Sequence, residues 1–104
     1  MPLQIDATDR GLKLAGELDM ATAQELLAAI RDHAGEDEVV LDFSGVSFMD
    51  SSGLRALLEA ARDREGDGAV AIVDPTPQVR RVLDISLPDG APGLEVRGGE
   101  EGGS

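Results

Sequence analysis

Four consecutive residues, Asp50-Ser51-Ser52-Gly53, carry the most suggestive chemistry in this chain. They follow a strongly apolar run and precede a segment with helical periodicity, so we predict that they lie where a loop enters a helix. At a helix N-terminus the backbone N–H groups point outward and the dipole is positive. A hydroxyl there either caps the helix or accepts a phosphoryl group. From these residues alone, a helix cap is the favoured interpretation of Ser51.

Gly53 and Ser52 complete this segment. A glycine near a helix start lets a partner loop or a nucleotide phosphate approach the serine closely. It equally tolerates a crowded contact with a neighbouring strand, and the sequence leaves both interpretations open. Ser52 lies one position along the same turn, so it competes with Ser51 for any modification.

Other reactive side chains are scarce. The chain has no cysteine, which excludes disulfides, thiol catalysis and cysteine-based zinc sites. His33 is the single histidine and is expected at the solvated end of a helix. Asp19 and Asp50 together supply too few ligands for a magnesium site. We therefore predict no metal and no cofactor.

The composition is acidic. Lys and Arg total 9 against 21 Asp and Glu, which gives a formal net charge of −12 over 104 residues. Such a chain is repelled by nucleic acids and by anionic lipid surfaces, so we expect protein partners instead. No apolar stretch suits a bilayer span and no basic signal peptide is present, which predicts a cytoplasmic protein. A monomer is the expected state.

The first part of the chain predicts a hairpin followed by a helix. Apolar and polar residues alternate over residues 3–8 and 11–15, with residues 16–19 expected as a loop. The helix is expected to begin near Thr22, because Thr22 and Glu25 fit a capping box, and to stop at Gly35. Its apolar stripe comprises Ala23, Leu26, Leu27, Ile30 and Ala34.

Residues 39–43 read as a central strand covered on both faces, or nearly so. Ser44 and Ser47 are expected to form hydrogen bonds in the loop that follows. A second helix is expected from Ser51 or Ser52, and its core stripe comprises Leu54, Leu57, Leu58 and Ala61.

The remaining residues add two strands and a third helix. A strand is expected over residues 69–73, a helix after Thr76-Pro77, and an edge strand over 94–97. Strands that alternate with helices predict an α/β fold in one domain over residues 1–97. The sheet is expected to be mixed, mostly parallel and four- or five-stranded, with about three or four helices. Residues 98–104 are expected to be a disordered tail.

Two motifs at this spacing resemble a known family. Gly16-Glu17-Leu18-Asp19 precedes the first helix, and Phe48-Met49-Asp50-Ser51-Ser52-Gly53-Leu54 opens the second. Together with the order of elements they resemble the STAS domain, and within it the anti-sigma factor antagonists. The resemblance covers the whole chain except the tail.

The resemblance implies a protein switch and not an enzyme. In that family the unphosphorylated antagonist binds an anti-sigma factor that is also a serine kinase, which frees the sigma factor. Phosphorylation of the first serine after the aspartate breaks the complex, and a separate phosphatase resets it. Matched onto this chain, the phosphorylated residue is Ser51. Asp19, Asp50, Ser52 and Gly53 form its surroundings.

Three alternatives compete with this interpretation. A STAS domain also serves as a scaffold or subunit of a transporter or stress-signalling complex without phosphorylation. An esterase-like enzyme would use Ser51 as a nucleophile, but its flanking positions hold Met49 and Gly53, and Met49 stands where a Gly-x-Ser-x-Gly elbow has its first glycine. A receiver domain needs a lysine late in the chain, whereas the only lysine is Lys13.

Overall fold

A computed structural model describes residues 3–33, 38–64 and 69–98 of the chain. The five strands and three helices in these ranges are, in order, β1 (Gln4–Ala7), β2 (Gly11–Leu18), α1 (Met20–Asp32), β3 (Val39–Met49), α2 (Ser51–Asp63), β4 (Val70–Val73), α3 (Pro77–Ser86) and β5 (Leu94–Arg97). The strands form one sheet in the order β1-β2-β3-β4-β5. β1 pairs antiparallel to β2, and the other pairs are parallel. The predicted α/β fold with a mixed, mostly parallel sheet is confirmed.

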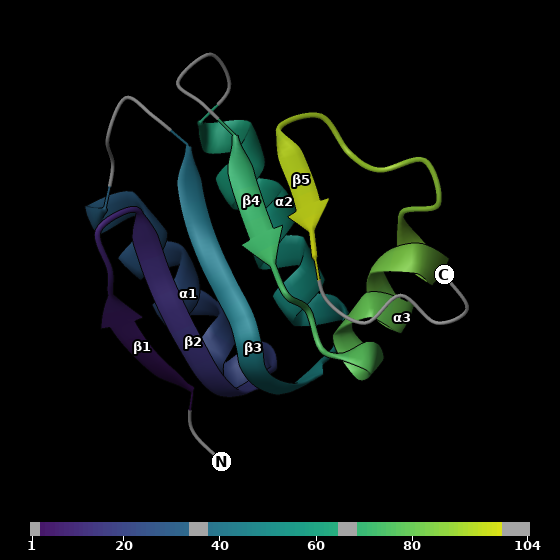
Figure 1. Ribbon diagram of the computed structural model, residues 1–104, viewed down its shortest axis with the longest axis horizontal. Coiled ribbons are helices and arrows are strands. Elements are labelled where there is room, and N and C mark those ends of the chain that lie inside the picture. Colours follow the sequence, from purple (N-terminus) through teal and green to yellow (C-terminus); the bar gives the residue numbers. More distant parts are fainter. Residues whose placement is uncertain (1–2, 34–37, 65–68, 99–104) are drawn as a thin grey trace.

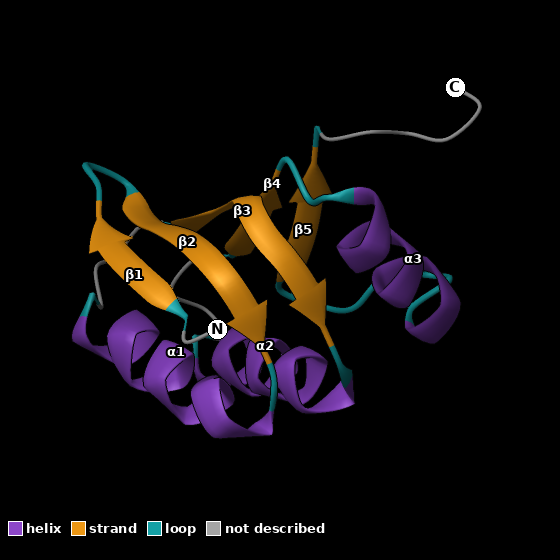
Figure 2. Ribbon diagram, turned by 90° about the horizontal axis from the view of Figure 1, so that it is seen from below, coloured by secondary structure: helices purple, strands orange, loops and turns teal. Residues whose placement is uncertain are grey.

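The helices are distributed unequally around the sheet (Figure 1). α1 and α2 pack side by side against one face, whereas α3 lies beside the sheet (Figure 2). The core fills the space between the sheet and the first two helices. Its largest fully buried side chains are Phe43, Leu14, Leu18, Leu26, Ile30, Leu41, Met49, Leu57 and Ile72.

Both long strands extend further than the sequence predicts. β2 continues through Leu18, so the expected loop at residues 16–19 is wrong except for its last residue. β3 continues through Met49, so Ser44 and Ser47 lie in a strand and not in a loop. Two irregularities in the β2–β3 register interrupt the alternation that marks a strand, and Gly16 has a positive φ of 114°.

The central strand is not packed on both of its faces. Val39, Leu41 and Phe43 are buried, whereas Val40 and Asp42 between them are half-buried. The strand is therefore fully covered on one face, where α1 and α2 pack, and only partly covered on the other (Figure 2). The polar residue inside the apolar run is the sequence signal of this open face.

The first helix begins earlier than predicted. Its N-cap is Asp19 and its first residue is Met20, so the predicted start near Thr22 is wrong. Thr22 does belong to a capping box, but as the N3 member: its hydroxyl accepts a hydrogen bond from the Asp19 backbone N–H at 3.0 Å. The predicted stripe is buried at Ala23, Leu26, Leu27 and Ile30. Ala34 and the predicted stop at Gly35 lie outside the described residues.

The later elements follow the prediction closely. In α2 the stripe Leu54, Leu57 and Ala61 is buried and Leu58 is half-buried. Thr76 is the N-cap of α3 with proline next to it, although the Thr76 side chain makes no capping hydrogen bond. β5 coincides with the predicted edge strand. Of the predicted tail, residues 99–104 lie outside the described residues.

Candidate functional site

Strand pairing brings the two sequence motifs together. Leu18 and Met49 are register partners at the carboxyl ends of β2 and β3, so the residues that follow them, Asp19 and Asp50, begin two neighbouring helices. The backbone N–H of Asp50 donates to the Leu18 carbonyl at 3.2 Å. Loops at the carboxyl ends of parallel strands are the usual place for sites in α/β proteins.

Each of these aspartates caps its own helix. One Asp50 carboxylate oxygen accepts hydrogen bonds from the N–H groups of Ser52 at 2.9 Å and Gly53 at 3.2 Å. The Asp19 carboxylate does the same for Ala21 at 3.0 Å and Thr22 at 3.1 Å. Both carboxylates are thus committed to backbone amides that would otherwise lack partners. Each aspartate therefore stabilises the start of its helix and also places a negative charge there.

The two serines differ in exposure. Ser51 is the first residue of α2 and is exposed, whereas Ser52 is half-buried. Because Asp50 holds the N-cap position, interpreting Ser51 as the helix cap is wrong. The Ser51 side chain is therefore not needed for capping and stands at the surface.

Gly53 is required by packing. A Cβ atom built on Gly53 would lie 2.6 Å from the Leu18 Cγ, 2.9 Å from the Leu18 carbonyl oxygen and 2.9 Å from the Met49 Cγ. Leu18 and Met49 are fully buried and one contact is to backbone, so these atoms have little room to move. Of the two interpretations of Gly53, the structure favours the crowded contact with the neighbouring strand.

The end of β3 is held by two side chains at the start of α3, Thr76 and Gln78. The Gln78 amide accepts from the Met49 N–H at 2.9 Å and donates to the Met49 carbonyl at 3.3 Å. The Thr76 hydroxyl donates to the Val46 carbonyl at 2.8 Å and makes no capping hydrogen bond to α3. The Gln78 side chain thus makes the hydrogen bonds to the Met49 backbone that a neighbouring strand would otherwise make, directly before Asp50.

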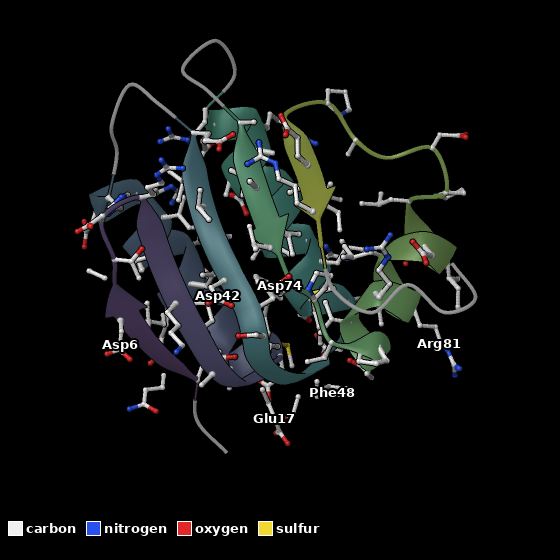
Figure 3. The ribbon with its side chains drawn as sticks, in the orientation of Figure 1. Asp6, Glu17, Asp42, Phe48, Asp74 and Arg81 are labelled. Carbon is white, nitrogen blue, oxygen red and sulfur yellow. The ribbon has the colours of Figure 1, made fainter. Side chains whose placement is uncertain are left out.

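Two large apolar side chains near this site are exposed. Met20, next to the Asp19 cap, is 77% exposed, and Phe48, two residues before Asp50, is 39% exposed. Phe48 is the register partner of Glu17, and Figure 3 shows both at the same end of the sheet. Methionine and aromatic side chains are the apolar residues enriched in protein–protein interfaces.

A groove lies between the starts of α1 and α2. It has a volume of about 160 Å³ and is lined by Met20, Ala23, Gln24, Ser52, Arg55, Ala56 and Glu59. Its lining includes the buried Ala23 and Ala56 and the exposed, oppositely charged Arg55 and Glu59. We call this feature the α1–α2 groove.

The remaining candidates lie away from this site. His33 is the C-cap of α1, and the 13 residues of that helix place it about 20 Å from the helix start. In the described ranges no group of three or more His, Cys, Asp or Glu residues is arranged to hold a metal ion. Within the same ranges, every helix is too short or too polar to span a lipid bilayer.

Comparisons with known proteins agree with this geometry. Residues 1–92 match the family model described as "Mlab, STAS domain". BtrV of Bordetella bronchiseptica is 35% identical over 92 residues, which cover 83% of this chain and 78% of that protein. The anti-sigma F factor antagonist of Paenibacillus polymyxa is 35% identical over 96 residues, which cover 83% and 80% of the two chains.

Two solved structures of one protein, in its unphosphorylated and phosphorylated forms, are similar to this chain. The unphosphorylated form of the anti-sigma factor antagonist SpoIIAA has a TM-score of 0.66 and 27% identity, over 90% of this chain and 86% of that one. The phosphorylated form of the Bacillus protein SpoIIAA has a TM-score of 0.58 and 25% identity, over 90% and 89% of the two chains.

Proposed function

This chain belongs to the STAS domain family, and on that premise we propose that it is an anti-sigma factor antagonist switched by phosphorylation of Ser51. The unphosphorylated chain binds an anti-sigma factor that is also a serine kinase, and a separate serine phosphatase reverses the modification. The proposal is of a regulatory binding protein acting in the cytoplasm, with no catalytic group of its own.

One observation carries the proposal: the hydroxyl of Ser51 is exposed at a helix start that does not use it. Asp50 supplies the cap, so Ser51 is accessible to a kinase without loss of the helix. The similarity to a protein solved in phosphorylated and unphosphorylated forms supports regulation by phosphorylation.

Phosphorylation changes the binding surface more than the fold. It adds about −1.5 to −2 charges at neutral pH. The α2 dipole favours this charge, whereas the carboxylates of Asp19 and Asp50 oppose it, so the two effects partly cancel within the domain. A partner packed over Ser51 would have to bury a dianion, which costs several kcal/mol when unpaired. A penalty of ~3 kcal/mol lowers affinity roughly a hundredfold.

The first test is the modification state of the protein in its own host. We would purify the chain with phosphatase inhibitors, measure its intact mass and locate any phosphate by fragmentation. A phosphate on Ser51 is the expected result. A phosphate on Ser52 would keep the mechanism and refute the residue assignment.

The second test is partner capture. Ser51→Ala should retain an anti-sigma factor from host lysate, and Ser51→Asp should lose it. Ser86→Ala is a matched control, since Ser86 is an exposed helical serine on α3. Two results together would favour the alternative, a scaffold or subunit that is not controlled by phosphorylation. The chain would be unmodified under all growth conditions, and the Ser51→Asp variant would bind the partner as well as the parent chain does.

A further inference from the structure

Arg55 lies on the same face of α2 as Ser51, one turn further along. Residues four apart on a helix are neighbours, with Cβ atoms about 5–6 Å apart. Long helical side chains lean toward the helix N-terminus, which directs Arg55 back toward Ser51. Arg55 is exposed and lines the α1–α2 groove together with Ser52.

Arg55 has no ion-pair partner among the described residues. The carboxylate best placed for it is Glu59, four residues further on. Glu59 lies 3.7 Å from the Arg31 guanidinium of α1 instead, and Arg31 also binds Asp63 at 2.7 Å. The guanidinium of Arg55 therefore remains available to an anion that arrives at the groove.

A phosphate on Ser51 would need such a donor. Helix starts usually bind anions through free backbone N–H groups. Here the N–H groups of Ser52 and Gly53 already donate to Asp50, so the free amides expected at this helix start are in part taken. Within α2, the guanidinium of Arg55 is the strong donor that can reach this phosphate.

We propose that Arg55 binds the phosphate of phosphorylated Ser51 within the same helix, an inference that rests on the proposed phosphorylation of Ser51. Arginine suits this task because its planar N–H groups match phosphate oxygens. The phosphate held by Arg55 lies along the rim of the α1–α2 groove. Phosphorylation then has two effects. It places negative charge at the helix start, and it pairs with the Arg55 guanidinium, which a docking partner would otherwise contact.

The test installs phosphoserine at position 51 by genetic code expansion, so that no kinase is needed. The second pKa of the phosphate is followed by phosphorus NMR as a function of pH. A nearby guanidinium favours the dianion and lowers this pKa from its usual value near 6. We expect Arg55→Ala to raise the phosphate pKa by ~0.3 units or more, as for an exposed pair four residues apart.

Arg62→Ala is the matched control. Arg62 is an exposed arginine on nearly the same stripe of α2, seven residues from Arg55 and thus about 10 Å further from the phosphate. It should leave the phosphate pKa unchanged, and Arg55→Lys should restore part of the shift. The carboxylates of Asp19, Asp50 and Glu59 are common to all variants and cancel in the comparison.

Two outcomes would overturn the proposal. One is an unchanged phosphate pKa in Arg55→Ala. The other is an equal shift in Arg62→Ala, which would reflect the overall charge and not a contact. Neither depends on whether the host phosphorylates Ser51, so failure here is distinct from failure of the proposed function. Circular dichroism of each variant confirms that α2 is intact.

Discussion

Replacing Gly53 with alanine separates packing from helix propensity at the start of α2. Alanine is favoured over glycine inside a helix by about 1 kcal/mol. The new Cβ, however, meets the Leu18 Cγ at 2.6 Å and the Leu18 carbonyl oxygen at 2.9 Å. Overpacking of this kind costs up to about 3 kcal/mol. We therefore expect Gly53→Ala to lower the free energy of unfolding by about 2 kcal/mol.

Thermal unfolding measures this directly. A chain of 104 residues has an unfolding entropy of about 0.22 kcal/mol/K at its midpoint. A loss of about 2 kcal/mol then lowers Tm by about 9 °C. Ser51→Ala is the control, because it lies two residues away in the same turn and adds no atom. Its effect on the free energy of unfolding should be within about 0.5 kcal/mol.

A second substitution checks the cause. Leu18→Ala removes the atom nearest the added Cβ, so Gly53→Ala should cost less in that background by about 0.5 kcal/mol or more. The reasoning is refuted if Gly53→Ala is as stable as the parent chain. If such a stable variant also lost its partner, Gly53 would serve close approach by the partner and not packing against β2.

Two further predictions concern charged residues. Asp50→Ala should lower the free energy of unfolding by about 1 kcal/mol through loss of the α2 cap, whereas Asp50→Asn should keep most of it because asparagine caps equally well; chemical denaturation measures both, and equal losses would contradict the capping role. The pKa of Glu38 should lie below 4.5, because the Arg97 guanidinium donates to its carboxylate at 2.6 and 2.9 Å. Since the folded-state pKa is the lowered one, the stabilisation is present above pH 4.5 and is lost as the pH falls through the folded value. An NMR titration in which Arg97→Ala left the Glu38 pKa unchanged would contradict it.

The sequence predicts the elements better than their ends. Stripes such as Leu54, Leu57 and Ala61 identify a helix because burial on one face requires that spacing. The ends of β2 and β3 are missed because irregular pairing breaks the period of two, and because Ser44 and Ser47 lie at exposed positions of a strand. Asp19 is missed as a cap for a different reason, since Thr22 satisfies the same local pattern three residues later.

The sequence likewise predicts some residues of the candidate site and misses others. The motif places Ser51 at a helix start, which the structure confirms, and its modification stays a proposal. Arg55 and Gln78 were not predictable as parts of the site from local patterns. Arg55 becomes notable only once Glu59 is seen to pair with Arg31, and Gln78 only once α3 is placed beside Met49. Both depend on contacts between elements distant in the sequence.

Contacts within the domain fix the backbone around Ser51, whereas the Ser51 side chain is exposed. Asp50 holds the α2 amides, Gln78 holds the Met49 backbone, and Gly53 rests against Leu18. Because these contacts leave the helix start little freedom to rearrange, we expect a phosphate on Ser51 to change the binding of a partner and not the conformation of the domain. It also means that losing a partner in Asp50→Ala cannot be attributed to a lost contact, since that change also weakens the helix. Asp50→Asn removes the charge and keeps the cap, so it is the variant that isolates the electrostatic role of Asp50 in binding.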